Sequence, residues 1–277
     1  MRTRQFAIGL CLFAGLWTAA PAEAQYGAGR NQSDRATGET YHVEIVGALW
    51  NPTPDIVISS EGLGQIGSNV DFVKTLGIEQ TRFKQLKIAL RPGTKHKLRF
   101  EYTPINYTAQ ANVPVSFVFN GQRYSVGIPV ATEVTWKAFR FGYEWDFFYR
   151  DRGFAGVLLE VKYTDVNATL TAAAVGTAQF AEAQAPIPAI GFIGRGYVAP
   201  NISITGEFSM FKLPDQAIET EDYSGKYYDL DIYGTVNFND HVGAQIGYRS
   251  FDVFYKVKHD TGALKLKGLY FGGVVRF

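Results

Sequence analysis

Residues that could carry catalytic chemistry are sparse in this sequence of 277 residues. The single cysteine, Cys11, lies in the apolar N-terminal stretch, so we expect neither disulfides nor thiol chemistry in the chain that follows. The four histidines, His42, His96, His241 and His259, are far apart in the sequence. There is no metal-ligand spacing, P-loop or dinucleotide-binding fingerprint. The sequence therefore predicts no cofactor, no metal site, no catalytic residue and no enzyme.

A larger group of ionisable residues alternates with apolar and aromatic residues. Side chains alternate between the two faces of a strand, so these charges share one face and the apolar residues share the other. We expect this group to point into the lumen of a barrel, where acidic and basic members nearly balance and would form ion pairs. The predicted lumen-facing residues are Glu44, Lys87, Arg99, Glu101, Arg140, Glu144, Asp146, Glu160, Lys162, Arg195, Glu207, Asp229, Asp231, Arg249 and Arg276.

The alternation defines about ten strands. They are expected at residues 41–50, 82–91, 97–108, 134–149, 154–170, 187–199, 202–212, 226–238, 242–258 and 264–277. The stretch 134–149 is the clearest, with Phe139, Phe141, Tyr143, Trp145, Phe147 and Tyr149 expected on one face. Such an aromatic face suits lipid better than a soluble core. The pattern predicts an all-β, closed antiparallel transmembrane barrel, with eight strands as the alternative to ten.

Two long connections are expected at one end of the barrel. Asn51-Pro52-Thr53-Pro54 is expected to end the first strand and open a connection of residues 51–81. Within it, residues 70–78 resemble the D-x-x-x-x-L-G stretch of the first long loop of small outer-membrane barrels, and we expect a short turn packed on the rim. The second connection, residues 109–132, contains Asn120-Gly121, which predicts a β-hairpin above the membrane.

The N-terminus predicts export. Arg2 and Arg4, an apolar core and Ala22-Glu23-Ala24 have the form of a secretory signal peptide over residues 1–24. Residues 25–40 are polar and aperiodic and are expected to form a flexible periplasmic lead-in, so that the barrel spans residues 41–277. Without its signal peptide the chain is formally neutral, which argues against a nucleic-acid partner.

The last strand ends on Phe277, preceded at alternate positions by Val275, Gly273, Phe271 and Leu269. This pattern resembles the C-terminal assembly signal of bacterial outer-membrane barrels. With the signal peptide, the alternation and the unequal connections, the chain resembles the small-barrel superfamily typified by OmpA, OmpX and OmpW. The resemblance implies a monomer in the cell outer membrane of a Gram-negative bacterium, bounded by lipid and lipopolysaccharide and inserted by the barrel-assembly machinery through Phe277.

Three functions remain open from the sequence. The balanced lumen favours a closed barrel with a structural or surface-interaction role. The inward arginines leave a narrow porin-like channel for small solutes as the alternative. The third is an outer-membrane hydrolase, because His259-Asp260, with Glu219, Glu221 and Asp222 in a neighbouring connection, resembles the Asp–His pair of outer-membrane proteases, which also have ten strands. His-Asp is also an ordinary turn dipeptide, and we interpret it as a turn.

Overall fold

The computed structural model describes residues 36–173, 176–179, 183–213 and 223–277. The predicted signal peptide and residues 25–35 of the predicted lead-in lie outside these ranges, as do Glu219, Glu221 and Asp222. Among the described residues, no helix is long and apolar enough to cross a membrane.

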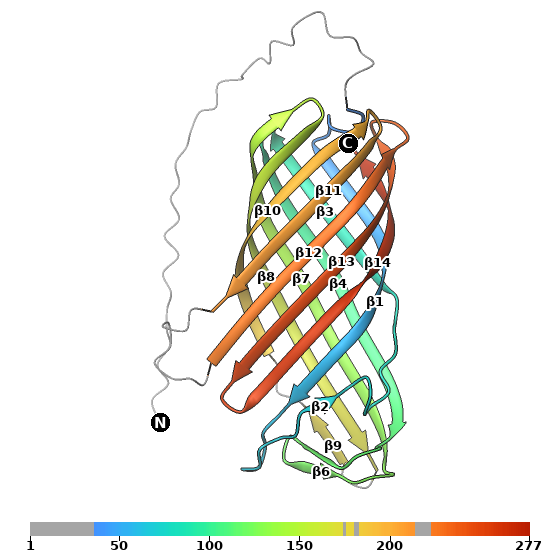
Figure 1. The fold of residues 1–277 in the computed structure, drawn as a ribbon, viewed down its shortest axis with the longest axis vertical. Coiled ribbons are helices and arrows are strands. Elements are labelled where there is room, and N and C mark those ends of the chain that lie inside the picture. Colours follow the sequence, from blue (N-terminus) through green and yellow to red (C-terminus); the bar gives the residue numbers. More distant parts are fainter. Residues whose placement is uncertain (1–35, 174–175, 180–182, 214–222) are drawn as a thin grey trace, which may run out of the picture. The chain divides into compact units, whose positions relative to one another are not determined.

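The described chain forms a closed antiparallel barrel of ten strands (Figure 1). Its strands are β1 (Val43–Ser59), β3 (Phe83–Gly93), β4 (His96–Asn112), β7 (Pro129–Arg150), β8 (Gly153–Ala172), β10 (Ala183–Ala199), β11 (Ile202–Lys212), β12 (Tyr223–Asn237), β13 (Val242–Val257) and β14 (Asp260–Arg276). Each pairs with the next, β8 pairs with β10, and β14 closes on β1. The predicted ten strands are confirmed, and the eight-stranded alternative is wrong.

The connections differ at the two ends of the barrel. Two to four residues join β3 to β4, β7 to β8, β10 to β11 and β12 to β13, and we call this the turn end. Most connections at the opposite end, the loop end, are longer and carry the small strands β2 (Val70–Asp71), β5 (Phe117–Phe119), β6 (Gln122–Tyr124) and β9 (Gly176–Gln179). This asymmetry is typical of outer-membrane barrels, whose short turns face the periplasm.

In the half of the barrel nearest the turn end, the outer surface is apolar and the inner surface is charged. The outward side chains include Phe141, Tyr143, Trp145, Leu159, Val161, Ile190, Phe192, Ile204, Phe208, Ile232, Ile246, Leu269, Phe271 and Val275, all of them exposed. A contiguous exposed apolar surface of this extent needs a lipid surrounding. We call this ring of side chains the lipid-facing belt.

In the loop half, the polarity of the two faces is reversed. On β8, the inward Val166, Ala168 and Leu170 are buried, while Asp165 and Asn167 point outward. The same holds on β1, β7 and β14, whose inward residues Ile56, Ile58, Val134, Trp136, Leu264 and Leu266 join one apolar cluster. Polar outward residues suit water, so this half projects beyond the lipid-facing belt and has an apolar core like that of a soluble protein.

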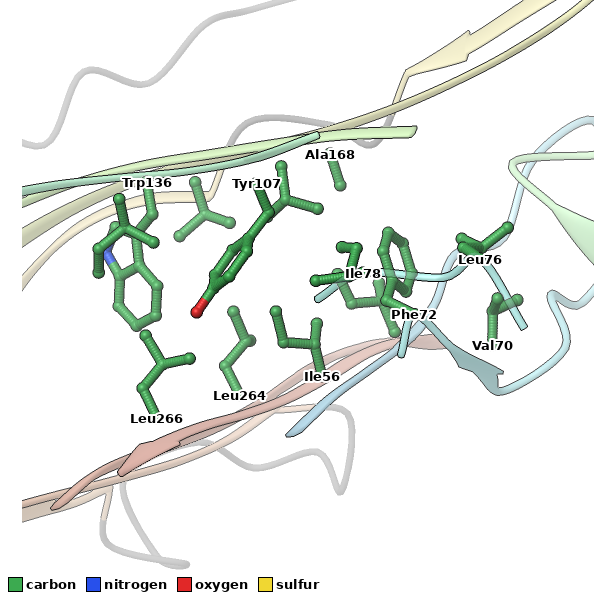
Figure 2. Packing of buried hydrophobic residues seen from close by; sticks show 14 of the residues in the cluster. Ile56, Val70, Phe72, Leu76, Ile78, Tyr107, Trp136, Ala168, Leu264 and Leu266 are labelled. Atoms are coloured by element: carbon green, nitrogen blue, oxygen red, sulfur yellow. The ribbon is translucent and has the colours of Figure 1, made fainter. Parts of the chain in front are cut away.

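The connection between β1 and β3 inserts into this core (Figure 2). Asp71 Oδ1 accepts hydrogen bonds from the backbone N–H groups of Val73 (3.0 Å) and Lys74 (2.9 Å) and so caps a single turn. Gly77 ends the turn at φ +72°, a conformation that glycine adopts without strain. The turn places Phe72, Leu76 and Ile78 between the opposing walls, each at most 2% exposed.

The predicted hairpin is confirmed, with shorter strands than expected. β5 and β6 pair across Asn120-Gly121, and both turn residues have positive φ, as a type I′ turn requires. Phe119 is fully buried, with its ring centroid 6.1 Å from that of Phe72. The hairpin therefore packs on the inserted turn, and the two together form what we call the loop-end plug (residues 70–78 and 117–124).

Two strand predictions were wrong in detail. β1 continues through Pro52 and Pro54 to Ser59. Beyond Trp50, β1 no longer pairs with β3. A proline there lacks an N–H on the unpaired side of the strand and therefore removes no hydrogen bond between strands. In β7, a bulge between Trp145 and Phe148 shifts the alternation. Phe148 is therefore exposed beside Phe147, while Tyr149 packs inside against Phe154 rather than joining the outer aromatic face.

Candidate functional site: the charged lumen

All the predicted lumen-facing residues lie inside the barrel. Each is less than 9% exposed except Lys87 and Arg99, whose side chains are 13% and 15% exposed. Burial of so many charges costs several kcal/mol for each one that lacks a partner. The geometry of their pairing therefore decides what the lumen can do.

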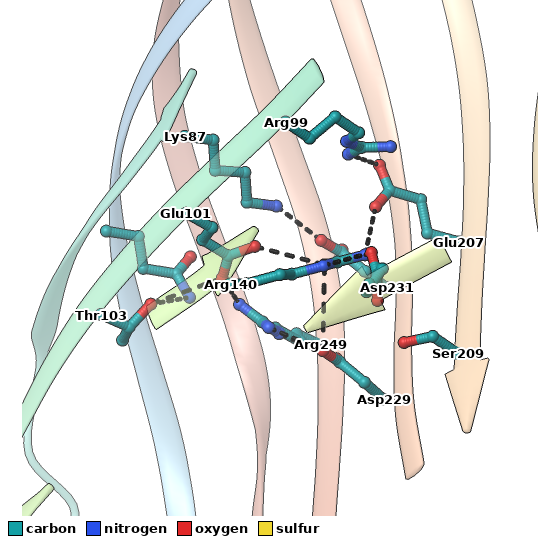
Figure 3. Close-up of polar contacts among 12 residues, drawn as sticks. Lys87, Arg99, Glu101, Thr103, Arg140, Glu207, Ser209, Asp229, Asp231 and Arg249 are labelled. Carbon is teal, nitrogen blue, oxygen red and sulfur yellow. Dashed lines mark hydrogen bonds and ion pairs between the residues drawn. The ribbon is translucent and has the colours of Figure 1, made fainter. Parts of the chain in front are cut away.

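Arg140 lies at the centre of the network (Figure 3). Its guanidinium is 2.5 Å from Glu160 Oε1, 3.3 Å from Glu101 Oε2 and 3.4 Å from Glu207 Oε2. These carboxylates come from β8, β4 and β11, so one side chain of β7 ties together strands on different sides of the barrel. Arg140 thus crosses the lumen instead of lining its wall.

Toward the turn end, the next layer of the network centres on β4. Arg99 Nη1 donates to Glu144 (2.8 Å) and Arg99 Nη2 to Glu207 (2.7 Å). Lys97 Nζ donates to Glu144 and to Asp146 Oδ2 (2.9 Å). Each carboxylate in this layer therefore contacts at least one cation, which offsets the desolvation of both charges.

A second branch runs along β12 and β13. Arg249 donates through Nε and Nη2 to the two oxygens of Asp229 (3.0 and 2.8 Å) and through Nη1 to Glu101. Lys162 Nζ also donates to Asp229 Oδ2, at 2.9 Å. The two-pronged Arg249–Asp229 contact fixes both side chains, because a planar guanidinium matches a carboxylate in geometry.

Tyrosine hydroxyls complete the pairing of the remaining carboxylates. Lys87 Nζ lies 2.6 Å from Asp231 Oδ2, and the Tyr270 hydroxyl donates to Asp231 Oδ1 at 2.9 Å. Tyr233 donates to Glu207 at 2.9 Å. Two cavities within the network have volumes of about 20 and 30 Å³. Each has room for one or two water molecules, so side chains fill most of this section.

Among the described residues, three charged residues of the lumen were not among those predicted. Lys97 faces inward on β4, and its alternation with the apolar Leu98 in the sequence already indicates this direction. Arg91 ends the inward series of β3 and donates to the backbone carbonyls of Glu39 and Thr94. Glu39 precedes the first strand and carries no periodic signal at all.

Glu39 belongs to a segment that closes the turn end. Residues 36–42, which we call the turn-end segment, include five residues of the predicted flexible lead-in, yet they are held in place. Arg195 Nη1 donates to Glu39 Oε1 at 2.8 Å, and the Tyr197 hydroxyl donates to the same oxygen at 2.8 Å. Burial alone would raise the pKa of Glu39, but attraction and hydrogen bonding by Arg195 outweigh it and hold that pKa below its usual value.

The C-terminus is joined to the same end of the barrel. Phe277 exchanges backbone hydrogen bonds with Val43 (2.9 and 3.0 Å), and the residue is 67% exposed next to the lipid-facing belt. Arg276, the preceding residue, points inward and pairs with Glu44 at 2.6 Å. The last strand therefore divides its side chains between lipid and lumen as its alternation predicts.

The residues considered for hydrolysis lie at the loop end. His259 Nδ1 is 2.6 Å from Glu61 Oε2, and the Asp260 carboxylate accepts from the Glu61 backbone N–H at 2.6 Å. Asp260 thus binds backbone, the carboxylate that contacts the imidazole is that of Glu61, and the side chain of His259 is 59% exposed. Within the described ranges no group of three or more His, Cys, Asp or Glu side chains could hold a metal ion.

Comparison with known proteins supports the fold. No protein-family model and no curated sequence matches the chain. Its structure is similar to that of the outer membrane protease OmpT from Escherichia coli, with a TM-score of 0.58 at 8% identity over 87% of this chain and 98% of that one. The toluene transporter TodX from Pseudomonas putida shares 9% identity at a TM-score of 0.35, covering 85% of this chain and 90% of its own. The chain thus has the fold of an outer-membrane β-barrel, as expected for its predicted place in the cell outer membrane.

Proposed function

We propose that the protein is a closed, non-conducting barrel of the outer membrane that acts through the surface of its loop end and is not an enzyme. The observation that carries this proposal is that the lumen is obstructed at three successive levels. The turn-end segment, the ion-pair network around Arg140 and the loop-end plug follow one another along the barrel axis. A solute would have to displace all three, including buried charge pairs whose separation costs about 3–5 kcal/mol each.

The alternative is a narrow channel for small solutes. It is motivated by Arg140, Arg195 and Arg249, which project inward, but each of them is engaged by at least one carboxylate. Swelling of vesicles that contain the protein tests the two functions. A closed barrel gives the swelling rate of empty vesicles in isotonic solutions of a small sugar or amino acid, whereas size-dependent swelling would establish the channel.

An enzymatic role is tested separately, at His259. The contact between His259 and Glu61 is compatible with a turn stabilised by a side-chain bridge, which is the role we assign to it. Hydrolysis of quenched fluorescent peptides by the reconstituted protein, lost in His259→Ala and in Glu61→Gln, would replace this assignment with a protease. We expect neither the wild type nor the variants to show hydrolysis.

Membership of the OmpA/OmpX/OmpW-like superfamily and a monomeric state belong to the same proposal. The exposed ring of Phe277 supports its role as the assembly signal, and the lipid-facing belt supports lipid and lipopolysaccharide as neighbours. Phe277→Ser should reduce insertion into the outer membrane, while Val275→Thr, a change on the same face, should matter less. Equal insertion of both variants and the wild type would remove Phe277 as the signal.

A further inference from the structure

The loop half of the barrel contains an apolar chamber that the sealed lumen does not explain. Its volume is about 470 Å³, far larger than either cavity within the ion-pair network. The lining residues come from β7, β8, β10, β11, β12, β13 and β14, and from Leu213, which follows β11. They include Trp136, Ile187, Gly225, Lys226, Tyr227 and Leu264.

The chamber is closed toward the ion-pair network. Tyr227 covers Lys162, whose Nζ lies 4.2 Å from the centroid of the tyrosine ring. Trp136 packs on Phe251 with ring centroids 4.8 Å apart. These side chains separate the chamber from the ion-pair network. A molecule in the chamber would therefore be held there and would not pass through the barrel.

The lining sets the chemistry of the occupant. Of the described lining residues, only Lys226 carries a charge, and it lies on the outer side of the wall. Trp136, Thr164, Tyr227 and Tyr255 each carry one polar group, and most of the others are apolar. A cavity whose walls are mostly apolar favours an apolar ligand over water. A methylene group is close in size to a water molecule, whose share of liquid volume is about 30 Å³, so the chamber has room for roughly fifteen such groups.

Among the described residues, the wall beside the chamber lacks strand pairing at one place. The ladder between β10 and β11 stops at the pair Ile190–Met210, although both strands continue toward the loop end. In that continuation, β10 carries Pro186 and Pro188 and remains paired with β8. Because the β8 ladder is intact, both proline nitrogens face away from β8. Lys212, the last residue of β11, is at the register position opposite Pro188, where the two strands are no longer paired and the missing N–H removes no ladder hydrogen bond.

We infer that the chamber binds the hydrocarbon chain of an amphiphile with an anionic head group, entering between β10 and β11. The opening begins at Ile190 and Met210, the last residues of the lipid-facing belt on these strands. Lys226 and its cross-strand neighbour Lys212 lie outside the wall at the same level, where a carboxylate or phosphate head would rest. This site goes beyond the proposed function, which needs no ligand.

The test uses tryptophan emission, because Trp136 lines the chamber. The protein carries Trp145→Phe to remove the tryptophan exposed on the lipid-facing belt, and it is reconstituted in phospholipid vesicles. In one arm the vesicles contain phospholipid with brominated acyl chains. In the other they contain ordinary lipid, and a brominated fatty acid is added. Bromine quenches tryptophan only at short range, so quenching reports a chain beside Trp136, and Trp136→Phe identifies the signal.

A variant that fills the chamber distinguishes quenching by a chain bound inside it from quenching by bromine outside the wall. Gly225→Leu places a side chain in the chamber, since the nearest atoms to a Cβ there are 3.8 Å away. The matched control is Gly206→Leu on β11, an exposed position where a Cβ meets nothing within 4 Å. We expect Gly225→Leu to abolish the quenching and Gly206→Leu to retain it. Ile187→Phe is the second filling variant if Gly225→Leu does not fold.

The two arms distinguish the source of the chain. Quenching with brominated phospholipid assigns the site to a membrane lipid, and quenching with the fatty acid alone assigns it to a free amphiphile. Absence of quenching in both arms would overturn the inference. Equal quenching in the filled and unfilled chambers would do the same, because the bromine would then act from outside the wall.

Discussion

Replacement of Arg140 by methionine should destabilise the barrel by about 3 kcal/mol, the lower end of the range for breaking a buried ion pair. The contacts determine this magnitude. Glu101 keeps Arg249, and Glu207 keeps Arg99 and Tyr233, when Arg140 is lost. Glu160 loses its contact of 2.5 Å and, among the described residues, keeps an ion pair with Lys162 alone, at 3.4 Å. The cost therefore falls mainly on one carboxylate.

Reversible urea unfolding in lipid vesicles, followed by tryptophan fluorescence, measures this cost. Glu160→Gln in the Arg140→Met background should recover at least half of the lost free energy of unfolding, because the carboxylate that lost its ion pair is then replaced by a neutral amide. The control is Lys74→Met, whose side chain is 86% exposed beside Asp71 and which should change stability by about 0.5 kcal/mol or less. A change below about 1 kcal/mol for Arg140→Met, or no recovery by Glu160→Gln, would refute an essential role for this ion pair.

Other predictions concern the two ends of the barrel and its closure. Phe72→Ala should cost the loop-end plug about 3–5 kcal/mol and expose residues 60–80 to added protease, whereas unchanged cleavage would contradict the packing in Figure 2. Because the pKa of Glu39 is lowered, its pairing with Arg195 stabilises the turn-end segment at neutral pH and is lost as pH falls through that lowered pKa; hydrogen exchange of residues 36–42 should accelerate there, and Glu39→Gln should remove the pH dependence. The unheated protein should migrate differently from the boiled protein on gels, and identical migration would contradict a closed barrel.

The lipid-crossing half of the fold could be predicted from alternation alone. Residues such as Arg140 and Phe141 differ so strongly that their faces are unambiguous, and the inward position of the charges follows from period two. The loop half was harder to interpret, because Val166 and Asp165 also alternate but with the opposite polarity. Alternation gives two faces and does not say which one meets water, so the apolar core and the chamber could not be predicted.

Local departures from strict strand alternation could not be predicted from the sequence either. The bulge that turns Tyr149 inward adds one residue to β7, and a string of aromatic residues gives no sign of the insertion. Pro52 and Pro54 indicate a strand end unless the strand is known to be unpaired on one side, and that depends on where β3 begins. Glu39 reaches Arg195 across more than 150 positions of sequence, a contact that only the closed barrel creates.

Single-channel recording of the reconstituted protein in a planar bilayer tests the sealed lumen most directly. The turn-end segment and the ion-pair network, which separate the loop half of the lumen from the turn end, predict a silent membrane at all voltages that the bilayer tolerates. Reproducible openings, with an ion selectivity that changes in Arg140→Ala and Arg195→Ala, would contradict the closed barrel and establish a channel through the charged lumen.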